Sequence, residues 1–119
     1  MTGIDFKLLA DADSRSFKAG ETIFRAGDPA SELYVVQSGT VEIRIGDRVI
    51  ETVSENGIFG EMALIDAAPR SATAVAAGDV RLVPVAQKQF LFLVSQTPFF
   101  ALNVMRVLAR RLRTANNLT

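Results

Sequence analysis

Residues 59–74 read Phe-Gly-Glu-Met-Ala-Leu-Ile-Asp-Ala-Ala-Pro-Arg-Ser-Ala-Thr-Ala, and the rest of the chain is arranged around them. A glycine and a carboxylate open a short apolar segment, and a proline stands directly before an arginine, a serine and small residues. Glycine lets a backbone come close to a ligand, and the guanidinium of arginine carries a permanent charge in a planar fork that matches two phosphate oxygens. The stretch is therefore a candidate anion-binding site.

The segment that follows Gly60 adds backbone groups to this candidate site. Residues 61–65 are good helix formers, so we expect a single helical turn that begins near Gly60. The free N–H groups and the dipole at the start of such a turn attract anions. Ser71 adds a hydroxyl close to Arg70, and the side chain of Ala72 is too small to block its own N–H.

Glu61 narrows the class of ligand. An ionised carboxylate repels phosphate and only accepts hydrogen bonds, so Glu61 would face a neutral donor such as a sugar hydroxyl, with its charge offset by Arg70. A ribose phosphate has both the anion and the hydroxyl. Alternatively, Glu61 and Arg70 form an exposed ion pair worth less than ~1 kcal/mol, and residues 72–77 are a small-residue strand packed against a helix. The residue types leave both interpretations open.

The composition of the 119-residue chain is that of one globular domain. Apolar residues make up 49% and charged residues 22%, which predicts a folded core rather than disorder. The 13 basic and 13 acidic residues balance, so the chain lacks the basic surface expected of a nucleic-acid-binding protein. We therefore expect no nucleic-acid partner.

The chain contains no cysteine and no histidine. These absences exclude disulfides, thiolate and histidine-cluster metal sites, and Ser-His-Asp hydrolysis. We expect no catalytic residue, no metal and no cofactor. The N-terminal residues have no signal-peptide core, and the longest apolar runs are too short to cross a bilayer. We therefore expect a cytoplasmic protein without membrane insertion.

Between residues 16 and 86, glycine-containing turns separate short β-branched and aromatic segments. Val41–Ile45 alternates strictly between apolar and polar residues, and residues 49–53 can pair with it across a short hairpin connection. Pro84 in the last segment suggests a sheet edge or a strand end. This pattern predicts a sandwich or an open barrel, with strands at Thr22–Phe24, 33–36, Val41–Ile45, 49–53 and 80–85.

Beyond Ala86 the apolar period becomes helical, with a short buried helix over residues 88–94. Thr97 and Pro98 then form an N-cap and a first helical position. The next helix carries an apolar stripe and places arginines on another, solvated face. The stripe comprises Ala101, Met105, Leu108, Leu112 and Ala115, and the arginines are Arg106, Arg110 and Arg113. The predicted organisation is a single domain with an N-terminal helix or arm (1–15), a β-roll (16–86) and C-terminal helices (87–119).

The block from Phe59 to Ile65, followed by Pro69-Arg70-Ser71-Ala72-Thr73, resembles the phosphate-binding cassette of cyclic nucleotide-binding domains. This family includes the bacterial catabolite activator protein, the regulatory subunits of protein kinase A and the cyclic-nucleotide-gated channels. The resemblance implies a mainly β fold: a jelly-roll-like β-roll (double-stranded β-helix) of about eight strands with a short cassette helix and C-terminal helices.

The resemblance also implies a ligand site. The glutamate that matches Glu61 would accept a hydrogen bond from the ribose 2′-hydroxyl, and the arginine that matches Arg70 would pair with the cyclic phosphate. Backbone N–H groups around Gly60 and Ala72 and the hydroxyl of Ser71 would assist, and the C-terminal helix would cap the base. Asn116 would reach a base edge, or else it belongs to a frayed polar terminus. The implied ligand-binding residues are Phe59, Gly60, Glu61, Met62, Ala63, Arg70, Ser71, Ala72 and Asn116.

Three functions follow from these observations. The first is a stand-alone, non-catalytic sensor of a cyclic nucleotide that acts on a protein effector in trans. Ser71 favours cAMP over cGMP, because threonine at this position is associated with cGMP in the family. The second is a ligand-silent or repurposed β-roll that serves as a protein-interaction module. The third, an enzyme on a cupin-like roll, is disfavoured because the chain has no histidines for the usual metal cluster.

Overall fold

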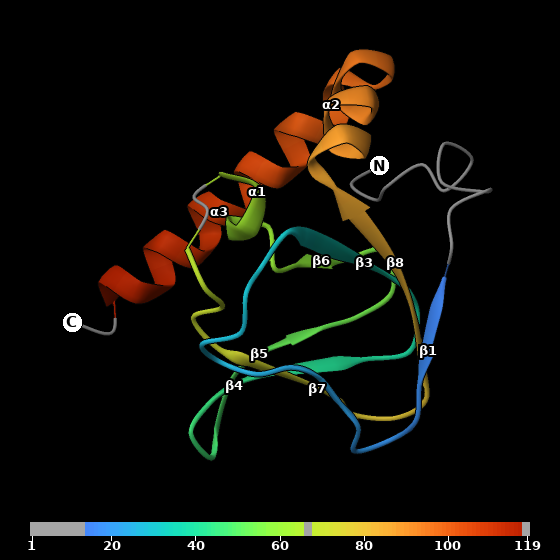
Figure 1. Cartoon of the computed structure of the whole chain (residues 1–119). Coiled ribbons are helices and arrows are strands. Elements are labelled where there is room, and N and C mark those ends of the chain that lie inside the picture. Colours follow the sequence, from blue (N-terminus) through green and yellow to red (C-terminus); the bar gives the residue numbers. More distant parts are fainter. Residues whose placement is uncertain (1–13, 66–67, 118–119) are drawn as a thin grey trace.

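The computed structural model describes residues 14–65 and 68–117, without the side chains of Ile65 and of residues 114–117. Nearly all of the predicted N-terminal arm (1–15) therefore lies outside the described residues. In the described part, eight strands form two four-stranded antiparallel sheets (Figure 1). The first sheet has the order β1-β8-β3-β6 and the second has the order β2-β7-β4-β5. The predicted mainly β roll is confirmed.

The strands are short and separated by turns, as the sequence predicts. Their bounds are β1 (Arg15–Phe17), β2 (Thr22–Phe24), β3 (Glu32–Ser38), β4 (Val41–Ile45), β5 (Arg48–Val53), β6 (Ile58–Phe59), β7 (Thr73–Ala76) and β8 (Val80–Ala86). The predicted hairpin joins β4 and β5, and Gly46 in its turn has φ +61°, a backbone conformation that favours glycine. The small-residue segment 72–77 contains β7, which pairs with both β2 and β4.

Pro84 lies in an inner strand, which corrects the expectation of a sheet edge. Its strand, β8, pairs with both β1 and β3. In the described residues, β1 pairs with β8 from Val80 to Leu82, and Pro84 lies two residues before the end of β8 at Ala86. Proline lacks an N–H to donate, and this position near the end of β8 accommodates that loss.

Strand β3 is buried on both of its faces, and its side chains enter two different cores. Because side chains alternate along a strand, Leu33 and Val35 face one way while Tyr34 and Val36 face the other. The first core packs the β3 sheet against the helices and includes Leu33, Val35, Ile58, Val83, Val85, Leu93, Phe100 and Val104. The second core fills the roll and includes Tyr34, Val36, Val41, Val53, Phe59, Ala74, Ala76, Val80 and Leu82.

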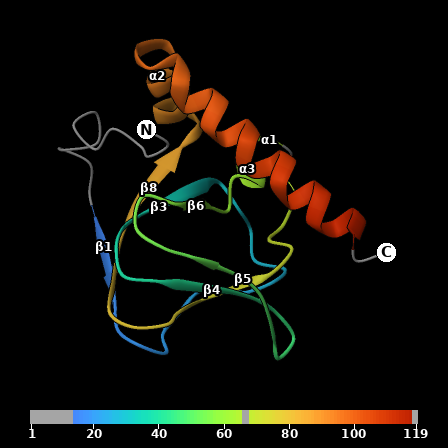
Figure 2. The same cartoon turned by 180° about the vertical axis from the view of Figure 1, so that it is seen from behind.

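Three helices complete the described chain: α1 (Met62–Ile65), α2 (Gln87–Gln96) and α3 (Pro98–Asn117). The predicted start of α3 at Pro98 is confirmed, and the backbone N–H of Phe100 donates to the carbonyl of Thr97 at 2.9 Å. Helix α3 runs obliquely across the roll and passes beside α1 in both views (Figures 1 and 2). It thereby brings Leu108, Arg111 and Leu112 to the cassette.

The face of α3 that packs on the roll differs from the predicted stripe. Phe100 and Val104 are buried, whereas Met105 is 58% exposed and Leu112 is 63% exposed. Leu108 packs partly against the core, as expected. Apolar side chains occur on more than one face of α3, so their spacing alone did not single out the packed face.

No single helix in the described part of the chain has both the length and the apolar composition needed to cross a membrane. Helices α2 and α3 reach the required length and apolar composition only when taken together. Their axes are bent by 118° at the break between them.

Candidate functional site

A cavity of about 610 Å³ opens between the cassette, the β4–β5 hairpin and helix α3. Eight of the predicted ligand-binding residues line it, namely Phe59, Gly60, Glu61, Met62, Ala63, Arg70, Ser71 and Ala72. The ninth, Asn116, lies in α3, but its side chain falls outside the described residues. Apolar side chains from the roll and from α3 complete the walls, including Phe24, Ile43, Ile50, Leu108 and Leu112.

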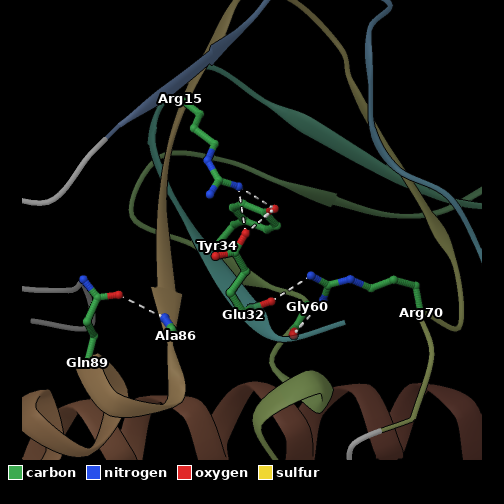
Figure 3. Close-up of polar contacts among 7 residues, drawn as sticks. All are labelled: Arg15, Glu32, Tyr34, Gly60, Arg70, Ala86 and Gln89. Carbon is green, nitrogen blue, oxygen red and sulfur yellow. Dashed lines mark hydrogen bonds and ion pairs between the residues drawn. The ribbon is translucent and has the colours of Figure 1, made fainter. Parts of the chain in front are cut away.

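Gly60 is required at its position for two reasons. Its φ is +76°, a conformation that side chains other than glycine rarely adopt. A Cβ at this position would also lie 2.6 Å from Nη1 of Arg70. The missing side chain lets the guanidinium reach the backbone, and Nη1 of Arg70 donates to the Gly60 carbonyl at 3.1 Å (Figure 3).

Arg70 is a buried cation whose hydrogen-bond partners are neutral. Arg70 is only 9% exposed. Its Nη2 donates to the backbone carbonyl of Glu32 at 2.8 Å. The guanidinium carbon lies 4.1 Å from the centre of the Phe24 ring, within the range of a cation–π interaction. Among the described residues, no carboxylate forms an ion pair with Arg70, and its buried Nε has no hydrogen-bond partner.

Burial lowers the pKa of Arg70 from its ordinary value, and the nearby Tyr34, Glu32 and Asp28 act in the opposite direction. Arginine remains charged at neutral pH even so. A short turn holds its backbone, because the N–H of Arg70 donates to the carbonyl of Asp28 and its carbonyl accepts from the N–H of Gly27. The charge is therefore held in place and remains available to an anion.

An aromatic group supports Arg70 from inside the roll. The rings of Phe24, Tyr34 and Phe59 lie with their centres 5.3–6.1 Å apart, a range favourable for aromatic contacts. The hydroxyl of Tyr34 donates to Glu32, which also pairs with Arg15 (Figure 3). Burial, followed by the hydrogen bond to Glu32, raises the pKa of Tyr34, so this hydroxyl keeps its proton. None of these supporting residues except Phe59 was among those predicted to bind the ligand.

Glu61 is only 2% exposed, and its carboxylate forms an ion pair with Nη1 of Arg111 from α3. This geometry corrects two expectations. The charge of Glu61 is offset by Arg111 rather than by Arg70, and the alternative of an exposed Glu61–Arg70 ion pair is wrong. A buried carboxylate needs such a partner, because the cost of removing a charge from water is high.

Arg111 joins three parts of the roll to α3. Its Nε and Nη2 donate to the two carboxylate oxygens of Glu51 on β5, at 2.8 and 3.0 Å. Its Nη2 also donates to the backbone carbonyl of Ile58 at 3.1 Å. Glu51, Glu61 and Arg111 all line the cavity. One guanidinium thus serves two carboxylates beside the cassette.

Glu51 and Arg111 were not among the residues predicted to bind the ligand. Arg111 lies seven positions after Val104, so it continues the buried face that Phe100 and Val104 begin. A charged residue on a buried helix face indicates a buried ionic partner. This signal could be used only once the packed face of α3 was known. No comparable signal in the sequence marks Glu51.

The model of the cyclic nucleotide-binding domain matches residues 14–97 of the chain. The chain belongs to the cyclic nucleotide-binding domain family. This match covers both sheets and the whole cassette, in which Arg70 and Glu61 are buried in one cavity. Among the described residues, no group of three or more acidic side chains could hold a metal ion.

Relatives of this cyclic nucleotide-binding domain include the cyclic AMP receptor protein of Thermus thermophilus, 37% identical over 107 residues, which are 86% of this chain and 50% of the relative. The crystal structure of the catabolite activator protein of Thermus thermophilus is similar, with a TM-score of 0.80 and 36% identity over 92% of this chain and 54% of that chain. The chain thus spans about half the length of these relatives.

A second structural relative is the EAL enzyme Bd1971, solved in a cAMP-bound form and in a cGMP-bound form. The TM-scores are 0.63 and 0.65, with 37% and 36% identity. Each match covers 88% of this chain, but only 30% and 29% of the enzyme. The similarity therefore concerns one domain of a longer protein.

Proposed function

We propose that this domain binds a cyclic nucleotide monophosphate, with cAMP as the preferred ligand, and releases it unchanged. The observation that carries the proposal is the separation of charges inside the cavity. Among the described residues, Arg70 is buried without a carboxylate ion-pair partner, and Glu61 is buried with Arg111 as its partner. The cavity can therefore hold an anion at Arg70 and a hydroxyl donor at Glu61.

The proposed pose follows from these partners. A phosphate oxygen would bind Arg70, whose planar donors suit a charge-assisted pair, and Ser71 and the Gly60 backbone would lie at the same end. The ribose 2′-hydroxyl would donate to Glu61. The base would lie against the apolar wall formed by Ile43, Ile50 and Leu108, which bury its flat surface.

Non-catalytic binding fits the chemistry of the lining residues. The chain has no histidine or cysteine. It therefore lacks the side chain that most often acts as a general base, and it has no thiol nucleophile. Glu61 is engaged with Arg111, so it is suited to hold a hydroxyl rather than to take a proton. We accordingly assign the cavity to a regulatory ligand.

The preference for cAMP is the finer part of the proposal. It is supported by Ser71 in place of threonine and by the printed name of the Thermus thermophilus relative, a cyclic AMP receptor protein. We extend the proposal to a protein effector that is regulated in trans and to a cytoplasmic location. The effector is supported by the printed name of another relative, a cAMP-dependent protein kinase regulatory subunit of Candida albicans, and the location is carried over from the sequence-based expectation.

Calorimetric titration with cAMP, cGMP and linear AMP tests the ligand class and the base preference together. We expect cAMP to bind most tightly and AMP most weakly. The open phosphate of AMP carries about one additional negative charge near neutral pH, which must leave water and lie in the same cavity as the carboxylate of Glu61. A parallel thermal-unfolding experiment should show about 2.7 kcal/mol of stabilisation at 100 times the dissociation constant. If neither cyclic nucleotide binds, the roll is better explained as a protein-interaction module.

A further inference from the structure

Arg111 has two carboxylate partners, and they are bound unequally. Glu51 takes two nitrogens of the guanidinium, in a bidentate pair at 2.8 and 3.0 Å. Glu61 forms an ion pair with Nη1, and its buried Oε1 has no hydrogen-bond partner. The side chain of Glu51 is 37% exposed and that of Glu61 is 2% exposed. The better-formed pair is therefore the one outside the cassette.

The same geometry divides the roles of the two carboxylates. Glu61 stands in the cassette, where the proposed ribose hydroxyl would compete for its lone pairs. Glu51 belongs to β5 and is separated from Arg111 by 60 positions in the sequence. Its bond to Arg111 ties α3 directly to the sheet. That tie uses Nε and Nη2 of Arg111, whereas Glu61 pairs with Nη1.

We propose that Glu51 is a positioning residue that acts through Arg111. It keeps α3 seated on the roll when the cavity is empty, and it holds the guanidinium where Nη1 can orient Glu61. The inference rests on the proposed function only for the ligand that Glu61 would receive. The seating of α3 by Glu51 is a property of the ligand-free chain.

The consequence is a specific coupling between helix and ligand. A ligand that binds only the seated state has an apparent affinity reduced by the fraction of chains that are seated. With Glu51 present, most chains are already seated and the ligand changes α3 little. Without the charge of Glu51, the ligand itself must shift more chains to the seated state.

Hydrogen–deuterium exchange of the α3 amides, with and without cAMP, tests this role in Glu51→Gln. The substitution keeps the shape of the side chain but removes its charge. We expect the ligand-free variant to exchange about fivefold faster around residues 108–113, as for the loss of one partly exposed ion pair. Saturating cAMP should restore the wild-type exchange, and the affinity for cAMP should fall by a factor of up to about five.

Glu42→Gln is the matched control. It makes the same chemical change in the Glu42–Arg44 ion pair on β4, and neither of these residues lines the cavity. It should leave the α3 exchange and the cAMP affinity at their wild-type values. Far-UV circular dichroism and thermal unfolding should show that both variants are folded.

Arg111→Gln, alone and combined with Glu51→Gln, separates positioning from general stability. If Glu51 acts through Arg111, adding Glu51→Gln to Arg111→Gln changes the α3 exchange no further. Wild-type α3 exchange in ligand-free Glu51→Gln, or full additivity of the two substitutions, would overturn the inference. Failure of the wild type to bind any cyclic nucleotide would instead overturn the proposed function, and the ligand-free exchange would still decide the role of Glu51.

Discussion

The two charged groups of the cavity are stabilised by different parts of the molecule. Arg70 is held by backbone carbonyls of Gly60 and Glu32 and by the face of Phe24, all of which belong to the roll. Glu61 is held by Arg111, which belongs to α3. The anion end of the cavity is thus built within the roll, whereas the carboxylate end is complete only when α3 is seated.

This difference means that the two ends of the cavity depend on different parts of the fold. A cation with neutral partners is ready for an anion without first breaking an ion pair, so the proposed phosphate end is preorganised. The carboxylate at the other end keeps its partner only while α3 is packed on the roll. The following substitutions test the comparison, from the largest expected effect to the smallest.

Arg70→Ala should have the largest effect on binding. We expect it to weaken cAMP binding by about 2–5 kcal/mol, the cost of removing one partner of a buried charge pair. Calorimetry measures the loss, with Arg81→Ala as the control because Arg81 is exposed, donates to the Ser14 hydroxyl and does not line the cavity. Equal affinity in Arg70→Ala and the wild type would show that the anion does not bind at this end.

Glu61→Ala should remove the discrimination between cAMP and 2′-deoxy-cAMP. In the wild type we expect the missing hydroxyl to cost about 1.5–3 kcal/mol, as for a hydrogen bond to a charged group. In Glu61→Ala the two ligands should bind with similar, weaker affinities. The four affinities form a double-mutant cycle, and a cycle without coupling would place the ribose elsewhere.

Gly60→Ala should destabilise the cassette by about 1–3 kcal/mol, because it combines a strained φ with a contact on Arg70. Gly20→Ala is a matched control, since Gly20 has φ +85° but open space around its Cβ position. Urea unfolding compares their stabilities, and calorimetry compares their cAMP affinities. Only Gly60→Ala should lose affinity for cAMP. An equal loss in both variants would show that the contact with Arg70 is not the cause.

Arg15→Gln should have the smallest effect. Arg15 pairs with Glu32 behind the site, and the two side chains are 48% and 21% exposed. Such a pair contributes about 0–1 kcal/mol to stability, because water screens it. We expect a small change in the urea midpoint and unchanged cAMP affinity. A clear loss of affinity would extend the site into the network around Tyr34.

The sequence predicted most of what is local. The hairpin between β4 and β5, the helical turn after Gly60 and the start of α3 at Pro98 each depend on a few neighbouring residues, whose turn and capping preferences are strong. Of the two expectations for Pro84, the strand end agrees with its place two residues before the end of β8. The sheet edge was wrong, because a strand's place in a sheet depends on which distant segments pair with it. The expected stripe on α3 was wrong because several of its faces carry apolar residues.

The sequence by itself determined which chemical groups the cassette carries. Gly60, Glu61 and Arg70 stand within eleven residues of each other and supply a close backbone approach, a hydrogen-bond-accepting carboxylate and a cation. Only the tertiary structure decided which charge balances Glu61. That charge is Arg111, which lies on α3, far along the chain from Glu61, and comes to the cassette only because α3 packs across the roll. Local preferences act over a few residues, whereas an ion pair between a helix and a sheet depends on how the whole chain folds.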